Sequence, residues 1–121
     1  MSDKSRTIMI VDDKADIRLA LRIALNARGF EVVEAGSGEE ALKKLRAEES
    51  PDIILLDVNM PGLGGLHACR AIRAGSPAQI IVMSAQSSET GKAEAFSAGA
   101  DGYIGKPFSI EELMLHIRAA T

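Results

Sequence analysis

The sequence predicts an α/β fold in which five βα units form a doubly wound domain around a parallel sheet. Short runs rich in β-branched residues alternate with longer stretches that have apolar residues at positions i, i+3, i+4 and i+7, a pattern typical of βα units. Three of the short runs are almost continuously apolar, as expected for strands covered on both faces. The chain has 121 residues, which favours one domain, so we expect residues 1–121 to form a single unit.

Each predicted element has its own sequence signal. The predicted strands are 7–11, 31–35, 53–56, 79–84 and 102–105. The predicted helices are 14–28, 39–48, 66–74, 90–98 and 110–120. The first helix has an apolar face formed by Ile17, Leu21, Ala24 and Leu25, and the last has one formed by Leu113, Met114 and Ile117. Two helix starts carry the Ser-x-x-Glu capping pattern, from Ser37 to Glu40 and from Ser109 to Glu112.

Composition narrows the class of protein. Hydrophobic residues make up 46% and charged residues 26%, which supports a folded core. The net charge is −3 and no Lys/Arg-rich block occurs, so direct nucleic-acid binding by this chain is disfavoured. No apolar run approaches the roughly 20 residues that span a bilayer, and residues 1–6 are too polar for a signal peptide, so a cytoplasmic, membrane-free location is expected. The single cysteine, Cys69, is expected in the core.

Polar residues follow four of the predicted strands. Asp12 and Asp13 come after the first strand, Asp57 after the third, Ser84 at the end of the fourth and Lys106 after the fifth. In open α/β sheets ligands bind outside the carboxyl ends of the strands, so these side chains should share one edge. Three carboxylates there repel one another unless a cation lies among them. Oxygen ligands supplemented by water favour Mg²⁺.

Each of these residues also has a simpler explanation when taken alone. Asp13 suits a helix N-cap, and Asp57 precedes the turn-forming residues 60–62. Ser84 and Lys106 suit an ordinary strand end and an ordinary exposed loop. Unrelated structural roles would not be expected to gather three acids, a hydroxyl and an ammonium group at one sheet edge. Their joint placement therefore favours a site.

In four segments the chain resembles the receiver domain of bacterial response regulators over essentially its whole length. The segments are residues 8–13, 51–61, 83–85 and 98–108. The resemblance implies the flavodoxin-like strand order 2-1-3-4-5. It also implies that Asp57 accepts a phosphoryl group from the phosphohistidine of a sensor histidine kinase. Asp13, Asp57 and the backbone carbonyl of Asn59 would then hold Mg²⁺, with Asp12 acting through a water molecule.

The same resemblance implies a switch. Lys106 supplies a second cation, and the Ser84 hydroxyl donates to a phosphoryl oxygen and pulls the loop after the fourth strand inward. Tyr103 matches the aromatic residue whose rotamer reports this movement. The signal then leaves through the fourth helix, fifth strand and fifth helix, toward an output domain, a partner protein or a phosphorylation-dependent homodimer. Asn59 and Gln86 flank the line of water attack and are expected to set the phosphoryl lifetime.

Two positions depart from the usual receiver pattern. Lys14 stands where many members carry a third acid, and adds positive charge that is expected to weaken Mg²⁺ binding or alter kinase docking. Gly64 stands where the turn often has an acid. His67 and His116 lie in predicted helices far in sequence from the acids, so we expect partly exposed helix residues rather than site residues.

Two alternative functions remain at this point. One is a small Mg²⁺-dependent phosphatase or hydrolase with Asp57 as nucleophile, although five βα units leave no insertion for a substrate lid. The other is a receiver-like interaction module that is never phosphorylated. The presence of all three acids together with Ser84 and Lys106 argues against this second alternative. Residues 84–89 and 106–113 are similar to receivers of winged-helix transcription regulators. The chain is thus either a stand-alone receiver or the N-terminal domain of a longer regulator.

Overall fold

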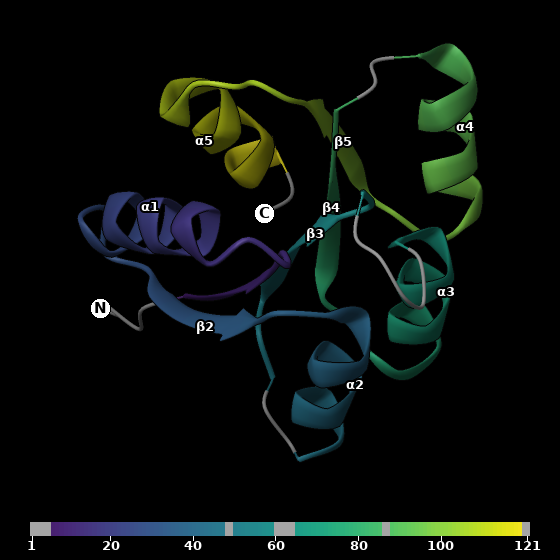
Figure 1. Cartoon of the computed structure of the whole chain (residues 1–121), viewed down its shortest axis with the longest axis horizontal. Coiled ribbons are helices and arrows are strands. Elements are labelled where there is room, and N and C mark those ends of the chain that lie inside the picture. The colour runs from purple at the N-terminus through teal and green to yellow at the C-terminus, as the bar shows by residue number, and fades with distance from the viewer. Residues whose placement is uncertain (1–5, 48–49, 60–64, 86–87, 120–121) are drawn as a thin grey trace.

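Strands and helices alternate along the chain in the computed structural model, which describes residues 6–47, 50–59, 65–85 and 88–119 (Figure 1). The strands are β1 (Thr7–Val11), β2 (Glu31–Ala35), β3 (Ile53–Asp57), β4 (Gln79–Ser84) and β5 (Gly102–Gly105). The helices are α1 (Ala15–Asn26), α2 (Gly38–Arg46), α3 (Gly65–Gly75), α4 (Glu89–Ser97) and α5 (Ile110–Ala119). This is the predicted succession of five βα units.

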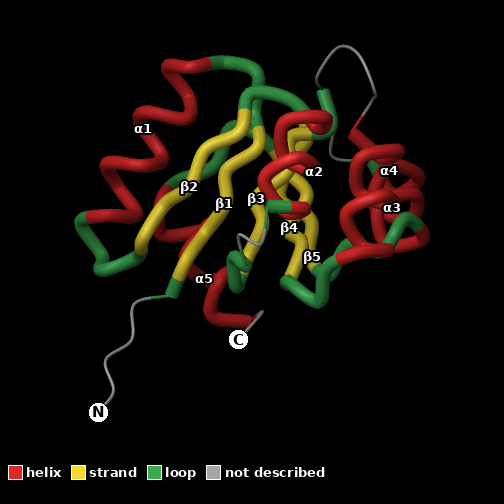
Figure 2. The backbone as a smooth tube through the Cα atoms, turned by 90° about the horizontal axis from the view of Figure 1, so that it is seen from below, coloured by secondary structure: helices red, strands yellow, loops and turns green. Residues whose placement is uncertain are grey.

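The five strands form one parallel sheet in the order β2-β1-β3-β4-β5. Helices α1 and α5 cover one face of this sheet, and α2, α3 and α4 cover the other (Figure 2). The strand order, the doubly wound arrangement and the flavodoxin-like class predicted from the sequence are therefore confirmed. No helix in the described part of the chain is long and apolar enough to cross a membrane.

Two hydrophobic cores lie on opposite faces of the sheet, because successive side chains of a strand point to opposite sides. Along β3, Ile53 and Leu55 join the core beneath α1 and α5, whereas Ile54 and Leu56 join the core beneath α2, α3 and α4. All four side chains are fully buried. This explains why the central strands are apolar without interruption and why the first polar side chains occur at their carboxyl ends.

Serine side chains cap the starts of α2 and α5. The Ser37 hydroxyl accepts a hydrogen bond from the amide of Glu40, and the Ser109 hydroxyl accepts one from the amide of Glu112, both at 3.0 Å. These are the two predicted capping starts. The Glu40 carboxylate, however, accepts from the amide of Gly36 at 2.8 Å, one residue before the serine.

The remaining differences are shifts of one or two residues. Helix α4 begins at Glu89 rather than at 90, because the Ser88 hydroxyl accepts from the amide of Gly91. Strand β3 continues to Asp57 because its pairing with β4 extends to Met83. Helix α1 ends at Asn26, and the chain turns at Gly29, whose φ of 91° lies in the left-handed region that glycine adopts at least cost. The predicted helix ends at 48 and 120 lie outside the described residues.

Candidate functional site at the carboxyl edge of the sheet

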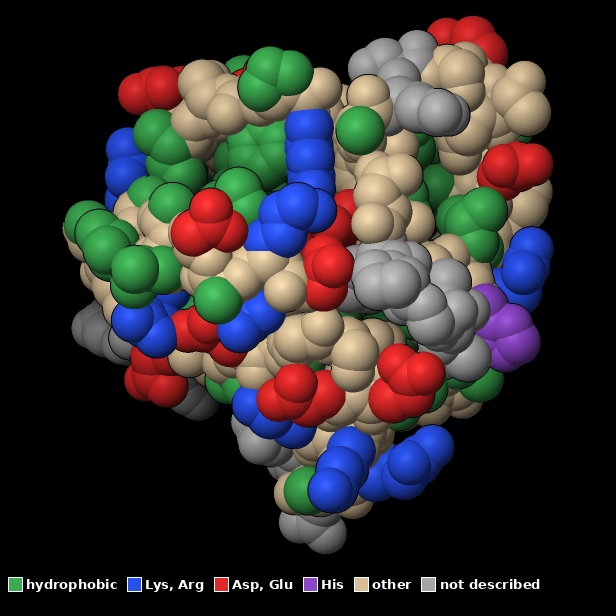
Figure 3. Space-filling model, viewed as in Figure 1, with side chains coloured by type: hydrophobic (Ala, Val, Ile, Leu, Met, Phe, Trp, Pro, Cys, Tyr) green, Lys and Arg blue, Asp and Glu red, His purple; other side chains and the backbone are tan. Residues whose placement is uncertain are grey.

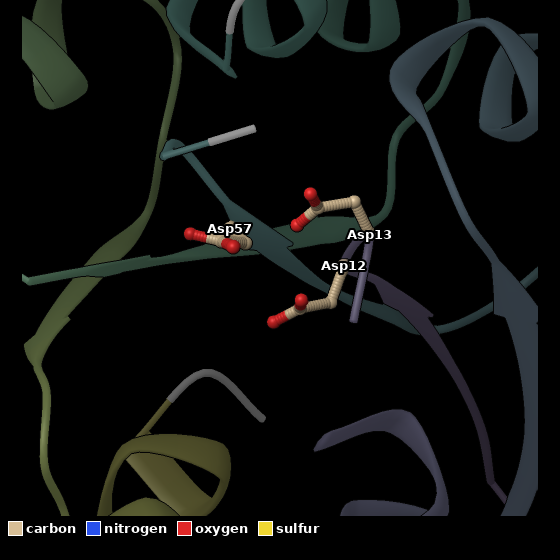
Figure 4. Close-up of side chains that lie close together, drawn as sticks. All are labelled: Asp12, Asp13 and Asp57. Atoms are coloured by element: carbon tan, nitrogen blue, oxygen red, sulfur yellow. The ribbon is translucent and has the colours of Figure 1, made fainter. Parts of the chain in front are cut away.

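Three aspartates converge at the carboxyl edge of the sheet (Figure 4). Asp12 and Asp13 directly follow β1, and Asp57 is the last residue of the neighbouring strand β3. One carboxylate oxygen from each lies within 4.8 Å of the other two. Asp12 and Asp57 are fully buried, whereas the side chain of Asp13 is 32% exposed. The structure thus brings together the three acids that were predicted from the sequence to lie at this edge.

The buried carboxylates are incompletely bonded. Oδ2 of Asp12 and Oδ2 of Asp57 are buried oxygens without a hydrogen-bond partner in the described part of the chain. The ammonium group of Lys106 lies 3.3 Å from Oδ1 of Asp57 and 3.6 Å from Oδ2 of Asp12. A buried charged oxygen without a partner is costly, so this arrangement marks a place where a ligand supplies the missing interaction.

Burial also changes the acidity of Asp12. Loss of solvent around its carboxylate raises the pKa of Asp12, and the negative charge of Asp57 raises it further. The amide of Lys14, which donates to Oδ1 of Asp12 at 2.9 Å, and the ammonium group of Lys106 act in the opposite direction on this pKa. Repulsion and desolvation therefore prevail over the available hydrogen bond and cation.

A divalent metal ion fits these residues. The partly buried Lys106 ammonium group offsets only part of the negative charge of Asp12 and Asp57, and hard oxygen ligands with room for water favour Mg²⁺ over softer metals. The unbonded Oδ2 atoms of Asp12 and Asp57 mark buried negative charge that such an ion would offset. The acidic cluster is thus typical of a magnesium site, as the sequence predicted.

Asn59 connects two loops of the site. Its backbone amide donates to Oδ1 of Asp57 at 2.9 Å, and its side-chain oxygen accepts from the amide of Ala85, just after β4, also at 2.9 Å. The sequence predicted a metal-binding role for its backbone carbonyl, which stays a prediction. The bridge from the β3 end to the β4 end was not foreseen, because nothing in the sequence indicates which loop an asparagine side chain will reach.

Ser84, the last residue of β4, lies beside Lys106, which directly follows β5. The strand register pairs Ser84 with Gly105, and the amide of Lys106 donates to the backbone oxygen of Ser84 at 2.7 Å. Ser84 is buried, at 5% exposure. A cavity of about 130 Å³ separates this strand end from α4, and its lining includes Ser84, Asn59 and Tyr103. The predicted switch residues therefore share one cavity beside the acidic cluster.

Gly91 of α4 lies directly against Tyr103. A Cβ atom at Gly91 would lie 3.3 Å from the Tyr103 hydroxyl oxygen and 3.0 Å from the Ser88 hydroxyl oxygen. Both separations are tight for a side chain. The absence of a side chain at Gly91 therefore makes room for the tyrosine hydroxyl above the first turn of α4.

The other residues singled out in the sequence lie at the margin. The ammonium group of Lys14 is 3.8 Å from Oδ1 of Asp13, on a side chain that is 58% exposed. His67 is exposed and His116 half-buried, as expected for helix residues. Cys69 is buried, and loss of solvent raises the pKa of its thiol. The turn at 60–62, Gly64 and Gln86 lie outside the described residues.

An apolar hollow lies between α1 and residues 106–108, which precede α5 (Figure 3). Its volume is about 530 Å³. Its lining residues are Ile17, Ala20, Leu21, Met83, Ala85, Lys106, Pro107 and Phe108. Lys106 thus borders both the acidic cluster and an accessible apolar surface.

Comparison with known proteins agrees with this geometry. The response regulator receiver domain family matches residues 8–118. The chain belongs to this family, whose members are the phosphoacceptor modules of two-component signalling.

Its similarity extends to named regulators and solved structures. The transcriptional regulatory protein KdpE of Mycobacterium tuberculosis is 38% identical over 113 residues, and the transcriptional regulatory protein ResD of Bacillus subtilis is 42% identical over 112. Each match covers 93% of this chain but only 50% and 46% of those proteins, so the chain spans about half the length of the curated relatives it matches.

Two solved structures illustrate the likeness of the fold. Chemotaxis protein CheY4 of Vibrio cholerae superposes with a TM-score of 0.92 at 31% identity, covering 98% of this chain and 100% of that one. Response regulator TrrA of Thermotoga maritima, in complex with Mg²⁺ and BeF, gives a TM-score of 0.85 at 34% identity, covering 96% and 99%.

Proposed function

We propose that Asp57 accepts a phosphoryl group from the phosphohistidine of a sensor histidine kinase, in a Mg²⁺-dependent reaction. In this transfer a bond forms between an Asp57 carboxylate oxygen and phosphorus while the bond from phosphorus to the histidine nitrogen breaks. The product is an aspartyl phosphate and a neutral imidazole. Phosphoryl transfer needs little covalent chemistry from a protein beyond alignment and charge neutralisation.

The observation that supports this proposal most strongly is the state of the Asp57 carboxylate. Its Oδ1 is held by the amide of Asn59 at 2.9 Å and lies 3.3 Å from the Lys106 ammonium group, whereas its Oδ2 has no hydrogen-bond partner among the described residues. One oxygen is thus fixed in place, and the other keeps its lone pairs for a new bond.

The surrounding residues have complementary roles in the proposal. Asp13, Asp57 and the backbone carbonyl of Asn59 would hold Mg²⁺, with Asp12 acting through water. The ion, when bound, offsets negative charge on the phosphoryl oxygens. Lys106, directly after β5, contributes the second positive charge, because its ammonium group already lies close to both Asp12 and Asp57.

The phosphorylated state is proposed to act through Ser84 and Tyr103. The Ser84 hydroxyl donates to a phosphoryl oxygen, which draws the β4 end toward Asp57 and opens space for the Tyr103 ring to move inward. The cavity that Ser84 and Tyr103 share gives this movement its room. The altered face formed by α4, β5 and α5 then controls a partner protein, an output domain or a second copy of the chain.

The wider setting is also part of the proposal. Because KdpE and ResD are transcriptional regulatory proteins about twice as long as their matched segments, we place residues 1–121 as the receiver unit of a cytoplasmic transcription regulator. DNA binding would then belong to another part of that protein, since this unit has a net charge of −3.

The proposal is tested by incubating the protein with acetyl phosphate and MgCl₂ and measuring its intact mass. One added phosphoryl group is expected, and EDTA should prevent its addition. Asp57→Asn should abolish the mass shift, and Asp52→Asn, which changes an acid at the opposite end of β3, should leave it unchanged. A phosphoryl group that still appears on the Asp57→Asn variant contradicts the proposal.

A further inference from the structure

Arg18, in the second turn of α1, reaches back from its helix to the loop that carries the acids. Its Nη1 atom donates to the backbone oxygen of Asp12 at 2.6 Å. Its Nε atom donates to the carboxylate of Glu34 on β2 at 3.1 Å, and the side chains of this pair are 20% and 24% exposed. The guanidinium group therefore connects three elements of the fold: β2, α1 and the loop after β1.

This contact completes the anchoring of Asp12. The amide of Asp12 donates to the backbone oxygen of Ala35 at 3.1 Å. Its carboxylate Oδ1 accepts from the amide of Lys14 at 2.9 Å, and its backbone oxygen accepts from Arg18. Three of the four polar atoms of Asp12 are thus used to hold it in place. Only Oδ2 remains, and it is the atom that lies toward the Lys106 ammonium group.

Glu34 is itself held firmly. Its other carboxylate oxygen accepts from Nη1 of Arg22, and its backbone oxygen accepts from the ammonium group of Lys44. Arg22 shares Glu34 with Arg18 but lies one turn further along α1. Among the described residues, Arg22 forms no hydrogen bond or ion pair with the Asp12 loop. The two arginines thus share an anchor and differ in whether they touch the loop.

We propose that Arg18 is a positioning residue that fixes Asp12, and with it the loop after β1, in the orientation needed for metal binding. The planar guanidinium group suits this role, because it can donate to a carboxylate and to a carbonyl in fixed directions at the same time. Arg18 does not contact the metal or the phosphoryl group. This inference rests on the proposed Mg²⁺ site formed by Asp12, Asp13, Asp57 and Asn59.

Charge and position predict opposite effects of losing this side chain. Removing a positive charge near three carboxylates should strengthen Mg²⁺ binding, because a repulsive interaction is lost. Releasing the backbone of Asp12 should weaken Mg²⁺ binding, because partners that orient metal ligands from outside typically contribute about 10-fold or more in affinity. The sign of the change therefore distinguishes positioning from a general charge effect.

The test is calorimetric titration of the metal-free protein with MgCl₂. Arg18→Gln should raise the dissociation constant about 10-fold, and Arg22→Gln, which removes the same charge from the same anchor, should leave it unchanged or lower it. Arg18→Lys keeps the charge and one donor and should give an intermediate value. Thermal unfolding in EDTA checks that all the variants are folded.

Two results overturn the inference. One is wild-type Mg²⁺ affinity in Arg18→Gln, and the other is an equal loss of affinity in Arg22→Gln. If Arg18→Gln does not fold, Glu34→Gln is tested instead, because it releases the Arg18 guanidinium group from its anchor. The Mg²⁺ affinity of Glu34→Gln should fall several-fold. An unchanged Mg²⁺ affinity in that variant overturns the inference. Failure of the wild-type protein to bind Mg²⁺ is a separate outcome, which contradicts the metal site itself.

Discussion

The two halves of the site are built differently. The acidic half, at the ends of β1 and β3, has backbone and side-chain hydrogen bonds on nearly every polar atom of Asp12, and Oδ1 of Asp57 is held by the amide of Asn59. The half at the ends of β4 and β5 contains the cavity shared by Ser84 and Tyr103. One half is fixed in place, and the other has room for a side chain to move.

The adjoining helices show the same contrast. Helix α1, next to the acids, buries Leu21 and Leu25, and two buried leucines contribute on the order of 3–6 kcal/mol. Helix α4, beside the cavity, buries Ala95 alone among its nine residues, all of which are described, and a buried methyl group contributes about 1 kcal/mol. Phosphoryl transfer requires fixed geometry, whereas signalling requires a weakly held element with two arrangements.

The largest effect is expected from Asp12→Asn in the acidic half. The amide can keep the hydrogen bond from the amide of Lys14, but the site loses a negative charge. We expect Mg²⁺ affinity to fall by about 100-fold, the upper end of the range for changes around a metal site. Titration calorimetry measures it, and an unchanged affinity would show that Asp12 contributes nothing to metal binding.

The next effect should appear in the switch half. Lys106→Ala removes the ammonium group that lies 3.3 Å from Asp57. We expect phosphoryl uptake from acetyl phosphate to continue more slowly, because a positive charge beside the phosphoryl oxygens is lost, while the response of Tyr103 to phosphorylation is lost. Tyr103 fluorescence reports this directly, since the chain has one tyrosine and no tryptophan. A wild-type fluorescence response in this variant would show that the two halves are not coupled through Lys106.

Stability should depend on pH through Asp12. Because the pKa of Asp12 is raised above its ordinary value of 3.8, the folded chain binds more protons than the unfolded chain between 3.8 and the raised value. The free energy of unfolding should therefore fall as pH rises through this window when metal is absent. Urea unfolding at a series of pH values in EDTA measures this.

Asp12→Asn is the control for that measurement. It removes the titrating group, so the downward slope should be smaller in the variant, and the metal-free fold should be more stable than wild type at neutral pH. Adding MgCl₂ to the wild-type protein at neutral pH should raise its free energy of unfolding, because an ion that binds the folded chain stabilises it. An identical pH dependence in the two proteins would assign the slope to another group.

The smallest effect is expected at Gly91, where the switch half depends on a missing side chain. Alanine is favoured over glycine in a helix by about 1 kcal/mol, but a Cβ at Gly91 would crowd the hydroxyl oxygens of Ser88 and Tyr103. Gly91→Ala should therefore gain little stability and change the Tyr103 fluorescence. Gly75→Ala, where a Cβ meets nothing within 4 Å, is the matched control and should leave the fluorescence unchanged.

The sequence predicted the fold and the acidic half better than the links between loops. Hydrophobic periodicity and strand-end position located Asp12, Asp13 and Asp57, because a parallel sheet necessarily brings its carboxyl ends together. The hydrogen bonds from Arg18 to the backbone of Asp12 and from the amide of Ala85 to the Asn59 side chain were not foreseen. Both depend on how far a long or flexible side chain reaches between segments distant in sequence, and periodicity contains no information about that reach.

Chemical mapping of the phosphoryl group tests the central claim most directly. After treatment with acetyl phosphate and MgCl₂, reduction with borohydride converts an aspartyl phosphate to homoserine, and peptide mass spectrometry locates it. The account predicts homoserine at position 57 and unchanged aspartate at positions 12 and 13. Homoserine at position 12 or 13, with Asp57 intact, would contradict it.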